Sequence, residues 1–194
     1  MGPATMKQLF TIEGKTAIVT GGSRGIGEMI ARGFVENGAK TYITARTEET
    51  CRSTAEALSQ YGECIAIPAD LSTLEGIKAF VQVFSEREET LDILVNNAGV
   101  MKGAELEDFP EDDWDQVMDI NLKSLFFLTQ QLLPTIKKAA TTDEPARIIN
   151  IASNAGILPP HRHTDYAYTA SKAGVINLTR HLAMSLCRDN ITVN

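Results

Sequence analysis

Cysteine is scarce in this chain, and the scarcity excludes two kinds of scaffold. Three of the 194 residues are cysteines, at positions 51, 64 and 187. Their number is odd and no two of them have the Cys-x-x-Cys spacing, so the sequence indicates neither a disulfide framework nor a zinc site. A reducing cytoplasm is the compartment that best fits these thiols.

An excess of positive charge is also missing. The formal net charge is −7, with 18 Lys and Arg against 25 Asp and Glu. Nucleic-acid and anionic-membrane surfaces select basic patches, so we expect neither partner. Residues 1–11 lack the apolar core of a signal peptide or anchor. We therefore expect residues 1–14 to be a short lead outside the fold.

No interior stretch rich in proline, glycine or serine divides the chain, and no internal repeat is evident. The hydrophobic content of 43% and charged content of 22% are typical of a soluble globular protein. We therefore expect a single domain over residues 15–194, a length common for one domain.

What the sequence does contain is an alternation of two kinds of segment. Short apolar runs rich in β-branched residues alternate with longer amphipathic stretches, as in buried parallel strands and their crossover helices. The expected strands are residues 16–20, 41–45, 64–68, 93–96 and 148–151, and the expected helices are 26–38, 48–61, 73–88, 111–138 and 168–189. This predicts an α/β fold, a Rossmann-like doubly wound parallel sheet that binds ligands beyond the carboxyl ends of its strands.

Local signals refine two of these helices. Ser72 and Glu75 have the spacing of a capping box, which predicts a helix start there. Pro110 is followed by three acidic residues, which is typical of a first helical turn. Pro134 is expected to kink or end the long helix 111–138.

A glycine-rich turn follows the first expected strand and leads directly into the first helix. Glycines let the backbone turn tightly and approach a pyrophosphate, while the free amides and dipole of the helix start favour its negative charge. This placement predicts a dinucleotide site. The expected cofactor-binding residues of this loop are Gly21, Ser23, Arg24, Gly25, Ile26 and Gly27.

The end of the second strand predicts which dinucleotide is bound. A carboxylate there would bond the ribose hydroxyls of NAD, but the residues are Ala45 and Arg46. Arg46, together with Arg24 from the glycine loop, is suited to pair with a 2′-phosphate. The two arginines favour NADP as cofactor, the alternative being two solvated surface side chains.

Tyr168 and Lys172 form the expected acid/base pair. Four residues apart on a helix, they lie on one face, one turn apart. A nearby ammonium favours the phenolate form of a tyrosine, which suits proton transfer. Tyr166 has no such partner, because Ala170 follows four residues later.

Taken together, these motifs resemble the short-chain dehydrogenase/reductase family. They follow the family's order over nearly the whole chain, and their joint occurrence is more specific than any one of them. Among its members, the sequence is most similar to NADPH-dependent β-ketoacyl reductases, including the type associated with rhamnolipid biosynthesis. The matching motifs are Thr20-Gly21-x-x-x-Gly25-x-Gly27, Asn96-Asn97-Ala98-Gly99, Asn121, Ser153 and Tyr168-x-x-x-Lys172.

The resemblance implies a role for each catalytic candidate. Tyr168 would be the general acid/base, Lys172 would stabilise its phenolate and bond the nicotinamide ribose, and Ser153 would position the carbonyl. Asn121 would hold a water that links Lys172 to solvent. Asp70 and Leu71 would bind at the adenine, Asn96 on the adenosine side, and Ala98 and Gly99 beneath the ribose, besides Tyr168 and Lys172 themselves.

The implied function is an oxidoreductase transferring a hydride between NADP(H) and a small-molecule carbonyl or alcohol, such as a 3-oxoacyl thioester. Family members are usually homodimers or homotetramers built on the long fourth and fifth helices. The alternative is a catalytically silent NADP-binding oligomeric or regulatory protein, or an inactive fragment. An extended-type sugar epimerase is disfavoured, because its glycine loop generally has two residues between the first two glycines rather than three.

Two segments depart from the family pattern. The loop between Ser153 and Tyr168 is longer than usual and contains Pro159, Pro160, His161, Arg162 and His163. No third histidine or cysteine accompanies the histidine pair, so we expect no metal, while Arg162 is a candidate for meeting an anionic substrate group. Residues 191–194 resemble the start of a sixth strand, so we expect a chain truncated there, without the family's C-terminal substrate-binding segment.

Overall fold

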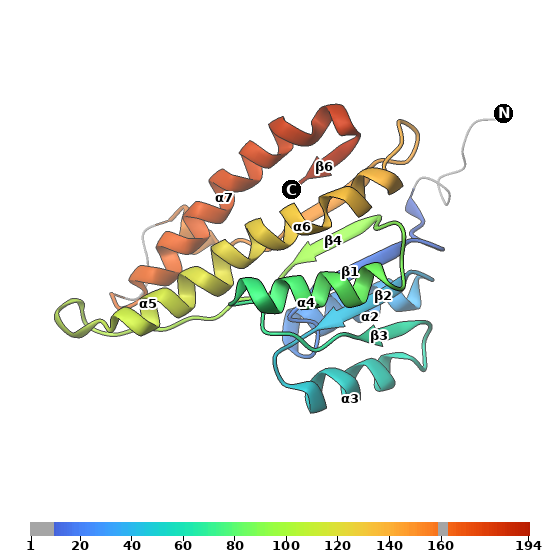
Figure 1. Cartoon of the computed structure of the whole chain (residues 1–194). Helices are drawn as coiled ribbons and strands as arrows, with labels where there is room; N and C mark the ends of the chain where they lie inside the picture. The colour runs from blue at the N-terminus through green and yellow to red at the C-terminus, as the bar shows by residue number, and fades with distance from the viewer. Residues whose placement is uncertain (1–9, 159–162) are drawn as a thin grey trace.

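Six parallel strands form one sheet in the computed structural model, which describes residues 10–158 and 163–194 (Figure 1). The strand order is β3-β2-β1-β4-β5-β6. The chain therefore runs outward from β1 to β3, crosses back to β4, and continues outward to β6. The predicted doubly wound parallel sheet is confirmed. Its strands are β1 (Thr16–Thr20), β2 (Lys40–Thr44), β3 (Cys64–Ala66), β4 (Ile93–Asn96), β5 (Ala146–Asn150) and β6 (Ile191–Val193).

Each predicted helix is present, with one internal irregularity. The helices are α2 (Gly25–Glu36), α3 (Glu48–Leu58), α4 (Leu74–Ser85), α5 (Glu111–Met118), α6 (Ser124–Ala139) and α7 (Tyr166–Leu186). The expected helix 111–138 is interrupted, because a π-helical turn, η2 (Asp119–Lys123), joins α5 to α6. Turns of this kind are frequent at functional sites.

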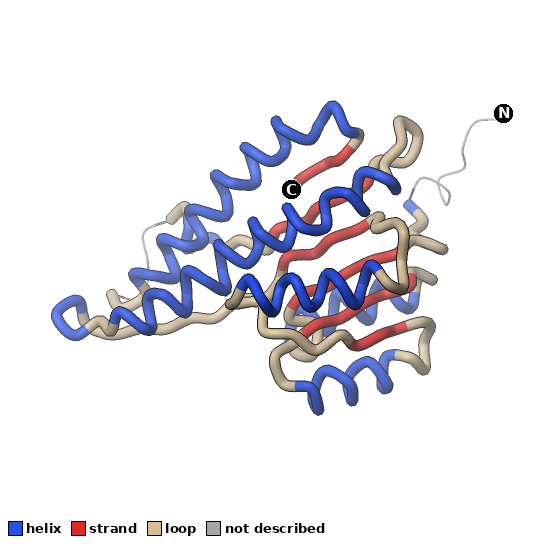
Figure 2. The backbone as a smooth tube through the Cα atoms, viewed as in Figure 1, coloured by secondary structure: helices blue, strands red, loops and turns tan. Residues whose placement is uncertain are grey.

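Two apolar layers hold the helices on opposite faces of the sheet. On one face, α4, α6 and α7 bury side chains such as Phe84, Leu132 and Leu186 against Ile18 and Leu94. Figure 2 shows these three helices crossing the same side of the strands. On the other face, α2 and α3 pack against alternate strand residues in a cluster that includes Ala17, Val19, Val35, Cys51 and Leu58. Alternation along β1 thus divides the core, as the pleat of a strand requires.

The helix signals were only partly correct. The N-cap of α4 is Thr73, whose hydroxyl accepts a hydrogen bond from the Gly76 amide at 3.0 Å. The capping box at Ser72 is therefore wrong, because the Ser72 hydroxyl donates to the Asp70 carboxylate at 2.7 Å instead. The start of α5 after Pro110 is confirmed. Pro134 does not end its helix, since α6 continues to Ala139.

Within the described residues, no helix is both long and apolar enough to cross a membrane. Most of the expected lead lies in residues 1–9, outside the described part of the chain. The same holds for Pro159, Pro160, His161 and Arg162, so the proposed contact of Arg162 with an anionic group stays a prediction.

Candidate active site and cofactor cleft

The glycine loop at the end of β1 has the backbone geometry that the motif predicted. Gly21 and Gly25 have φ angles of +64° and +56°, a region that side chains disfavour. A β-carbon on Gly27 would lie 2.2 Å from the carbonyl oxygen of Gly21, so only glycine fits there. Arg24 is the N-cap of α2 and its side chain makes no capping bond, which leaves the first amides of the helix available to an anion.

Asn97 and Thr20 fasten this loop to the end of β4. The Asn97 side-chain amide donates to the carbonyl oxygens of Thr20 at 2.9 Å and Gly21 at 3.3 Å. The Thr20 hydroxyl in turn accepts from the backbone amides of Asn97 and Ala98, both at 2.9 Å. These bonds connect two segments about 77 residues apart in the chain and fix the floor of a cleft.

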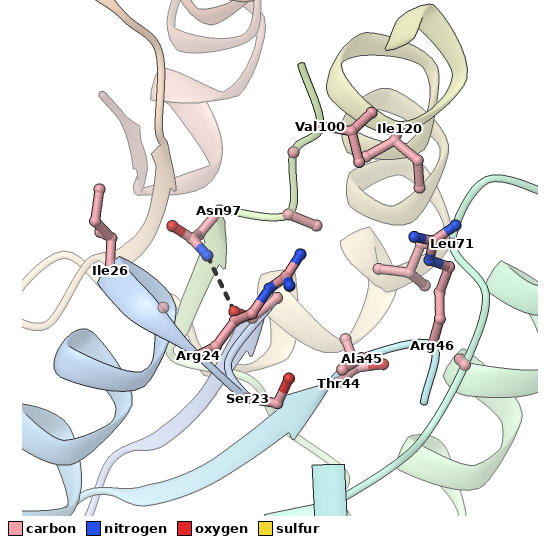
Figure 3. A pocket seen from close by; sticks show the side chains of 15 residues that line it. Ser23, Arg24, Ile26, Thr44, Ala45, Arg46, Leu71, Asn97, Val100 and Ile120 are labelled. Carbon is pink, nitrogen blue, oxygen red and sulfur yellow. Dashed lines mark hydrogen bonds between the residues drawn. The ribbon is translucent and has the colours of Figure 1, made fainter. Parts of the chain in front are cut away.

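The cleft has a volume of about 260 Å³ and opens at the carboxyl ends of β1, β2 and β4 (Figure 3). It is lined by most of the residues predicted to bind the cofactor. These are Gly21, Ser23, Arg24, Ile26, Gly27, Arg46, Leu71, Ala98 and Gly99.

Five predicted cofactor residues are not among those that line the cleft: Gly25, Asp70, Asn96, Tyr168 and Lys172. Gly25 is the first residue of α2 and lies between the lining residues Arg24 and Ile26, and Asp70 lies between the lining residues Ala69 and Leu71. Asn96 is 5% exposed, and its amide donates into the protein, to Asn150 at 2.9 Å. Its side chain therefore bonds inside the protein, and its contact on the adenosine side of the cofactor stays a prediction.

Asp70 is an ionised carboxylate held beside the cleft. Burial alone raises its pKa, but hydrogen bonds from the Ser72 hydroxyl and amide and the positive charge of Arg46 together hold the pKa below its ordinary value. Arg24 and Arg46 are exposed and extend from different walls, the first from the glycine loop and the second after β2 (Figure 3). The two guanidinium groups thus provide positive charge at the adenosine end of the predicted site.

The catalytic candidates adjoin the other end of the cleft. Asn121 lies in the π-helical turn, where its side-chain oxygen accepts from the Val100 amide at 2.8 Å and its amide donates to the Val100 carbonyl at 3.0 Å. Val100 and its neighbour Gly99 both line the cleft. A β-carbon on Gly99 would lie 3.8 Å from the Nζ atom of Lys172. The cleft therefore leads directly to the lysine.

Lys172 is buried, and its ammonium group lies over the ring of Tyr168. Its side chain donates to the Ile151 carbonyl at 2.6 Å, and Nζ lies 5.8 Å from the centre of the Tyr168 ring. Lys172 is 5% exposed, and burial lowers the pKa of its ammonium group. Ser171 connects this helix turn to Asn121, because its hydroxyl accepts from the Asn121 amide at 3.0 Å and donates to the Tyr168 carbonyl at 2.7 Å.

Ser153 follows β5 and is the N-cap of the short helix η3 (Asn154–Gly156). Its hydroxyl makes local bonds, accepting from the Ala155 amide at 3.2 Å and donating to the Asn154 side chain at 3.3 Å. A β-carbon on Gly156 would lie 2.7 Å from the Lys172 carbonyl carbon, so η3 packs directly on the turn of α7 that holds Lys172. Among the described residues, no group of acidic, histidine and cysteine side chains is arranged to hold a metal.

Comparison with known proteins places this arrangement in a family. The model of the short chain dehydrogenase family matches residues 15–194. The chain belongs to the short chain dehydrogenase family. It is 49% identical over 189 residues to the rhamnolipids biosynthesis 3-oxoacyl-[acyl-carrier-protein] reductase of Pseudomonas aeruginosa, covering 97% of this chain and 73% of the relative.

Two further members support the assignment. A FabG 3-oxoacyl-[acyl-carrier-protein] reductase from Chlamydia pneumoniae is 39% identical over 186 residues, which is 95% of this chain and 73% of that protein. The solved active-site complex of Pseudomonas aeruginosa RhlG with NADP superimposes with a TM-score of 0.92 at 49% identity, covering 95% of this chain and 72% of that one.

The two tyrosines at the start of α7 have different surroundings. Tyr166 lies two residues before Tyr168, but its ring packs against Phe109 with centroids 6.0 Å apart. It lines a separate cavity of about 260 Å³ with Trp114 and Leu106. The prediction that Tyr166 is not paired with a lysine agrees with this placement.

Sequence reasoning missed several residues of the cleft. Asn97 is the most informative, because its amide joins the two strand ends, and its place in the Asn96-Asn97-Ala98-Gly99 motif was the available signal. The others are apolar or small residues without a chemical signature. They are Thr44, Ala45, Ala69, Val100 and Ile120.

Proposed function

We propose that this short chain dehydrogenase binds NADP(H) and interconverts a carbonyl compound and an alcohol, with a 3-oxoacyl thioester as the substrate. The observation that carries the proposal is the junction of cleft and catalytic turn, where Gly99 approaches both Asn121 and Lys172. The relatives named above are 3-oxoacyl-[acyl-carrier-protein] reductases, and one solved relative holds NADP, which favours the same chemistry here.

The residues present fit such a cofactor. The backbone cradle at Gly21 and Gly27 is closed to any side chain, which matches the close approach of a pyrophosphate to uncapped helix amides. Arg24 and Arg46 would hold a 2′-phosphate through charge-assisted hydrogen bonds. Asp70 and Leu71 would bind at the adenine, and the backbone of Ala98 and Gly99 would lie beneath the nicotinamide ribose.

Within this proposal each catalytic residue has one task. NADPH, when bound, supplies the hydride that reduces the carbonyl carbon. Tyr168 donates the proton of its hydroxyl to the carbonyl oxygen, and Lys172 stabilises the phenolate that remains and bonds the ribose. The Ser153 hydroxyl positions the carbonyl. Asn121 holds a water that returns protons from solvent to Lys172.

Three properties of the whole protein belong to the same proposal. Residues 15–194 form the dinucleotide-binding domain and act in the cytoplasm. The subunits associate as homodimers or homotetramers through α6 and α7, which expose Phe126 and Met184. Light scattering of the purified protein at several concentrations measures this association directly.

The test of function is the oxidation of NADPH in the presence of acetoacetyl thioesters and a panel of simple ketones. We expect turnover, faster with NADPH than with NADH. Calorimetry that detects NADPH binding together with no turnover of any substrate would instead favour a nucleotide-binding protein without catalytic activity. Failure of both binding and turnover would reject the proposed function altogether.

A further inference from the structure

We propose that Asn150 and Thr179 are positioning residues for Lys172. Lys172 itself holds α7 against the end of β5 through its bond to the Ile151 carbonyl, and the Asn150–Thr179 bond holds the helix there at a second point. The inference rests on the role proposed above for Lys172, and it concerns two side chains that no sequence motif singled out. Asn150 is the last residue of β5 and is 8% exposed. Its side-chain amide donates to the Thr179 hydroxyl of α7 at 2.9 Å.

The two docking points come from neighbouring residues of the strand and from one face of the helix. Asn150 bonds Thr179, and the carbonyl of the next residue, Ile151, accepts from Lys172. Thr179 follows Lys172 by seven residues, which is about two helical turns and about 10.5 Å along the axis. A seven-residue step returns to within about 20° of the same face. The pair of bonds therefore fixes both the height and the rotation of α7.

The direction of the second bond is determined by its surroundings. The Thr179 hydroxyl donates its proton to the Val175 carbonyl at 2.7 Å, so its oxygen is left to accept from Asn150. The side-chain oxygen of Asn150 accepts from the Asn96 amide at 2.9 Å, which fixes the orientation of the Asn150 amide. Asn96 also donates to Thr129 of α6 at 3.3 Å. The network thus runs from α6 across β4 and β5 to α7.

Lys172 depends on this arrangement more than a surface lysine would. Among the described residues it forms no ion pair, and its side chain donates to the Ile151 carbonyl alone. The titratable group that faces it is Tyr168. A shift of α7 along β5 would move the ammonium group relative to the Ile151 carbonyl, the tyrosine and the wall at Gly99 together. Misplacement of a catalytic group by about 1 Å can cost up to 10²-fold in rate.

The test compares two threonine variants at opposite ends of the network. Thr179→Val removes the acceptor on α7, and Thr129→Val removes a hydroxyl of the same size on α6 without touching the lysine. The readout is the NMR titration of lysines labelled with 13C at Cε, with the Lys172 signal assigned by its loss in Lys172→Met. This measurement needs neither cofactor nor turnover.

We expect Thr179→Val to move the Lys172 titration midpoint upward by about half a pH unit or more, because a displaced ammonium regains water. Thr129→Val should leave the midpoint unchanged, and Thr179→Ser, which keeps the acceptor, should restore the wild-type value. In an active preparation, Thr179→Val should also lower kcat by roughly tenfold.

Equal midpoints in the two valine variants would overturn the inference, whether both move or neither does. If Thr179→Val does not fold, Asn150→Ala removes the donor of the same bond and is judged by the same criterion. Failure of NADPH turnover in the wild-type protein would count against the proposed function only, because the titration reports the lysine position by itself.

Discussion

The two halves of the sheet carry two kinds of site. Around β1 and β2, the cleft is made of backbone, with glycines that admit no side chain and arginines that are exposed. Around β4, β5 and α7, the site is made of side chains that are buried and bonded to one another, as for Asn121 and Lys172. In the first half, the close approach of backbone segments leaves no room for side chains at the glycines. In the second half, hydrogen bonds hold buried polar side chains in fixed positions.

The difference has consequences for how each half tolerates change. A backbone cradle fails by steric overlap, and exposed charges act through attraction that solvent weakens. A buried polar group is stable only if its partners are satisfied, so its loss affects chemistry and folding together. Variants in the two halves should therefore differ in which property they change first.

The largest effect is expected in the side-chain half. Tyr168→Phe removes the hydroxyl that is proposed to donate the proton and should lower kcat by roughly 10²- to 10⁴-fold, while the dissociation constant of NADPH changes little. Tyr166→Phe is the matched control, because Tyr166 packs against Phe109 in a separate cavity. Steady-state kinetics of both variants measure whether the loss of kcat is specific to Tyr168. Equal turnover in Tyr168→Phe and the wild type would reject the mechanism.

The backbone half should fail in the opposite way. A β-carbon on Gly27 would lie 2.2 Å from the Gly21 carbonyl oxygen and 2.5 Å from the Asn97 amide nitrogen. Gly27→Ala should therefore lower the free energy of unfolding by about 1–3 kcal/mol and weaken NADPH binding, since the cradle must open.

Gly33→Ala is the control for this prediction. Gly33 lies in the same helix, and a β-carbon there would meet nothing within 4 Å. It should raise stability by up to about 1 kcal/mol through helix propensity. Denaturant unfolding and fluorescence titration with NADPH test both variants, and unchanged NADPH affinity in Gly27→Ala would show that the cradle does not bind the cofactor.

The same contrast explains what the sequence allowed us to predict. The cradle is local, because Gly21 to Gly27 are contiguous and their spacing reflects the turn that they make. The Tyr168 and Lys172 pair is also local, since both lie on one helical face. By contrast, the Asn150 to Thr179 bond joins segments 29 residues apart, and nothing in either residue type indicates a partner.

What the sequence did not indicate has a similar origin. The choice between Ser72 and Thr73 as the α4 cap depends on Asp70, which takes the Ser72 hydroxyl. The π-helical turn at Asn121 lies inside a segment whose apolar residues have the spacing of an uninterrupted α-helix. Asn96 and Asn97 are adjacent and chemically identical, but the Asn96 side chain bonds Asn150 inside the protein, whereas the Asn97 side chain bonds the glycine loop and lines the cleft. Tertiary contacts, which a pattern does not record, decide all three.

The exposed arginines should produce a smaller and more selective effect. Arg46→Ala should weaken NADPH binding by roughly tenfold to a hundredfold, because a charge-assisted bond to the 2′-phosphate is lost. NADH binding should change much less. Arg52→Ala serves as the control, since Arg52 is exposed on α3 and pairs with Glu48 outside the cleft. Equal losses for NADPH and NADH would show that Arg46 does not recognise the phosphate.

The last prediction concerns a small change in stability at Lys172, where stability and activity should change in opposite directions. Burial lowers the pKa of this ammonium group, so its charged form is disfavoured in the folded protein. At neutral pH, Lys172→Met should abolish turnover yet raise the free energy of unfolding by an amount on the order of 1 kcal/mol. Removing the buried charge stabilises the fold, and leaving the Ile151 carbonyl without its donor offsets part of that gain.

The gain in stability should depend on pH in a definite direction. Between the lowered pKa and the ordinary pKa of lysine, the unfolded wild-type chain binds a proton that the folded chain does not, so wild-type stability rises with pH. Methionine carries no charge, so the advantage of Lys172→Met is largest at neutral pH and shrinks as the pH is raised toward the ordinary lysine pKa. Lys78→Met, an exposed position on α4, should show no such trend. Unfolding curves at several pH values measure the difference, and an advantage that grew with pH would mean that burial does not oppose the charge of Lys172.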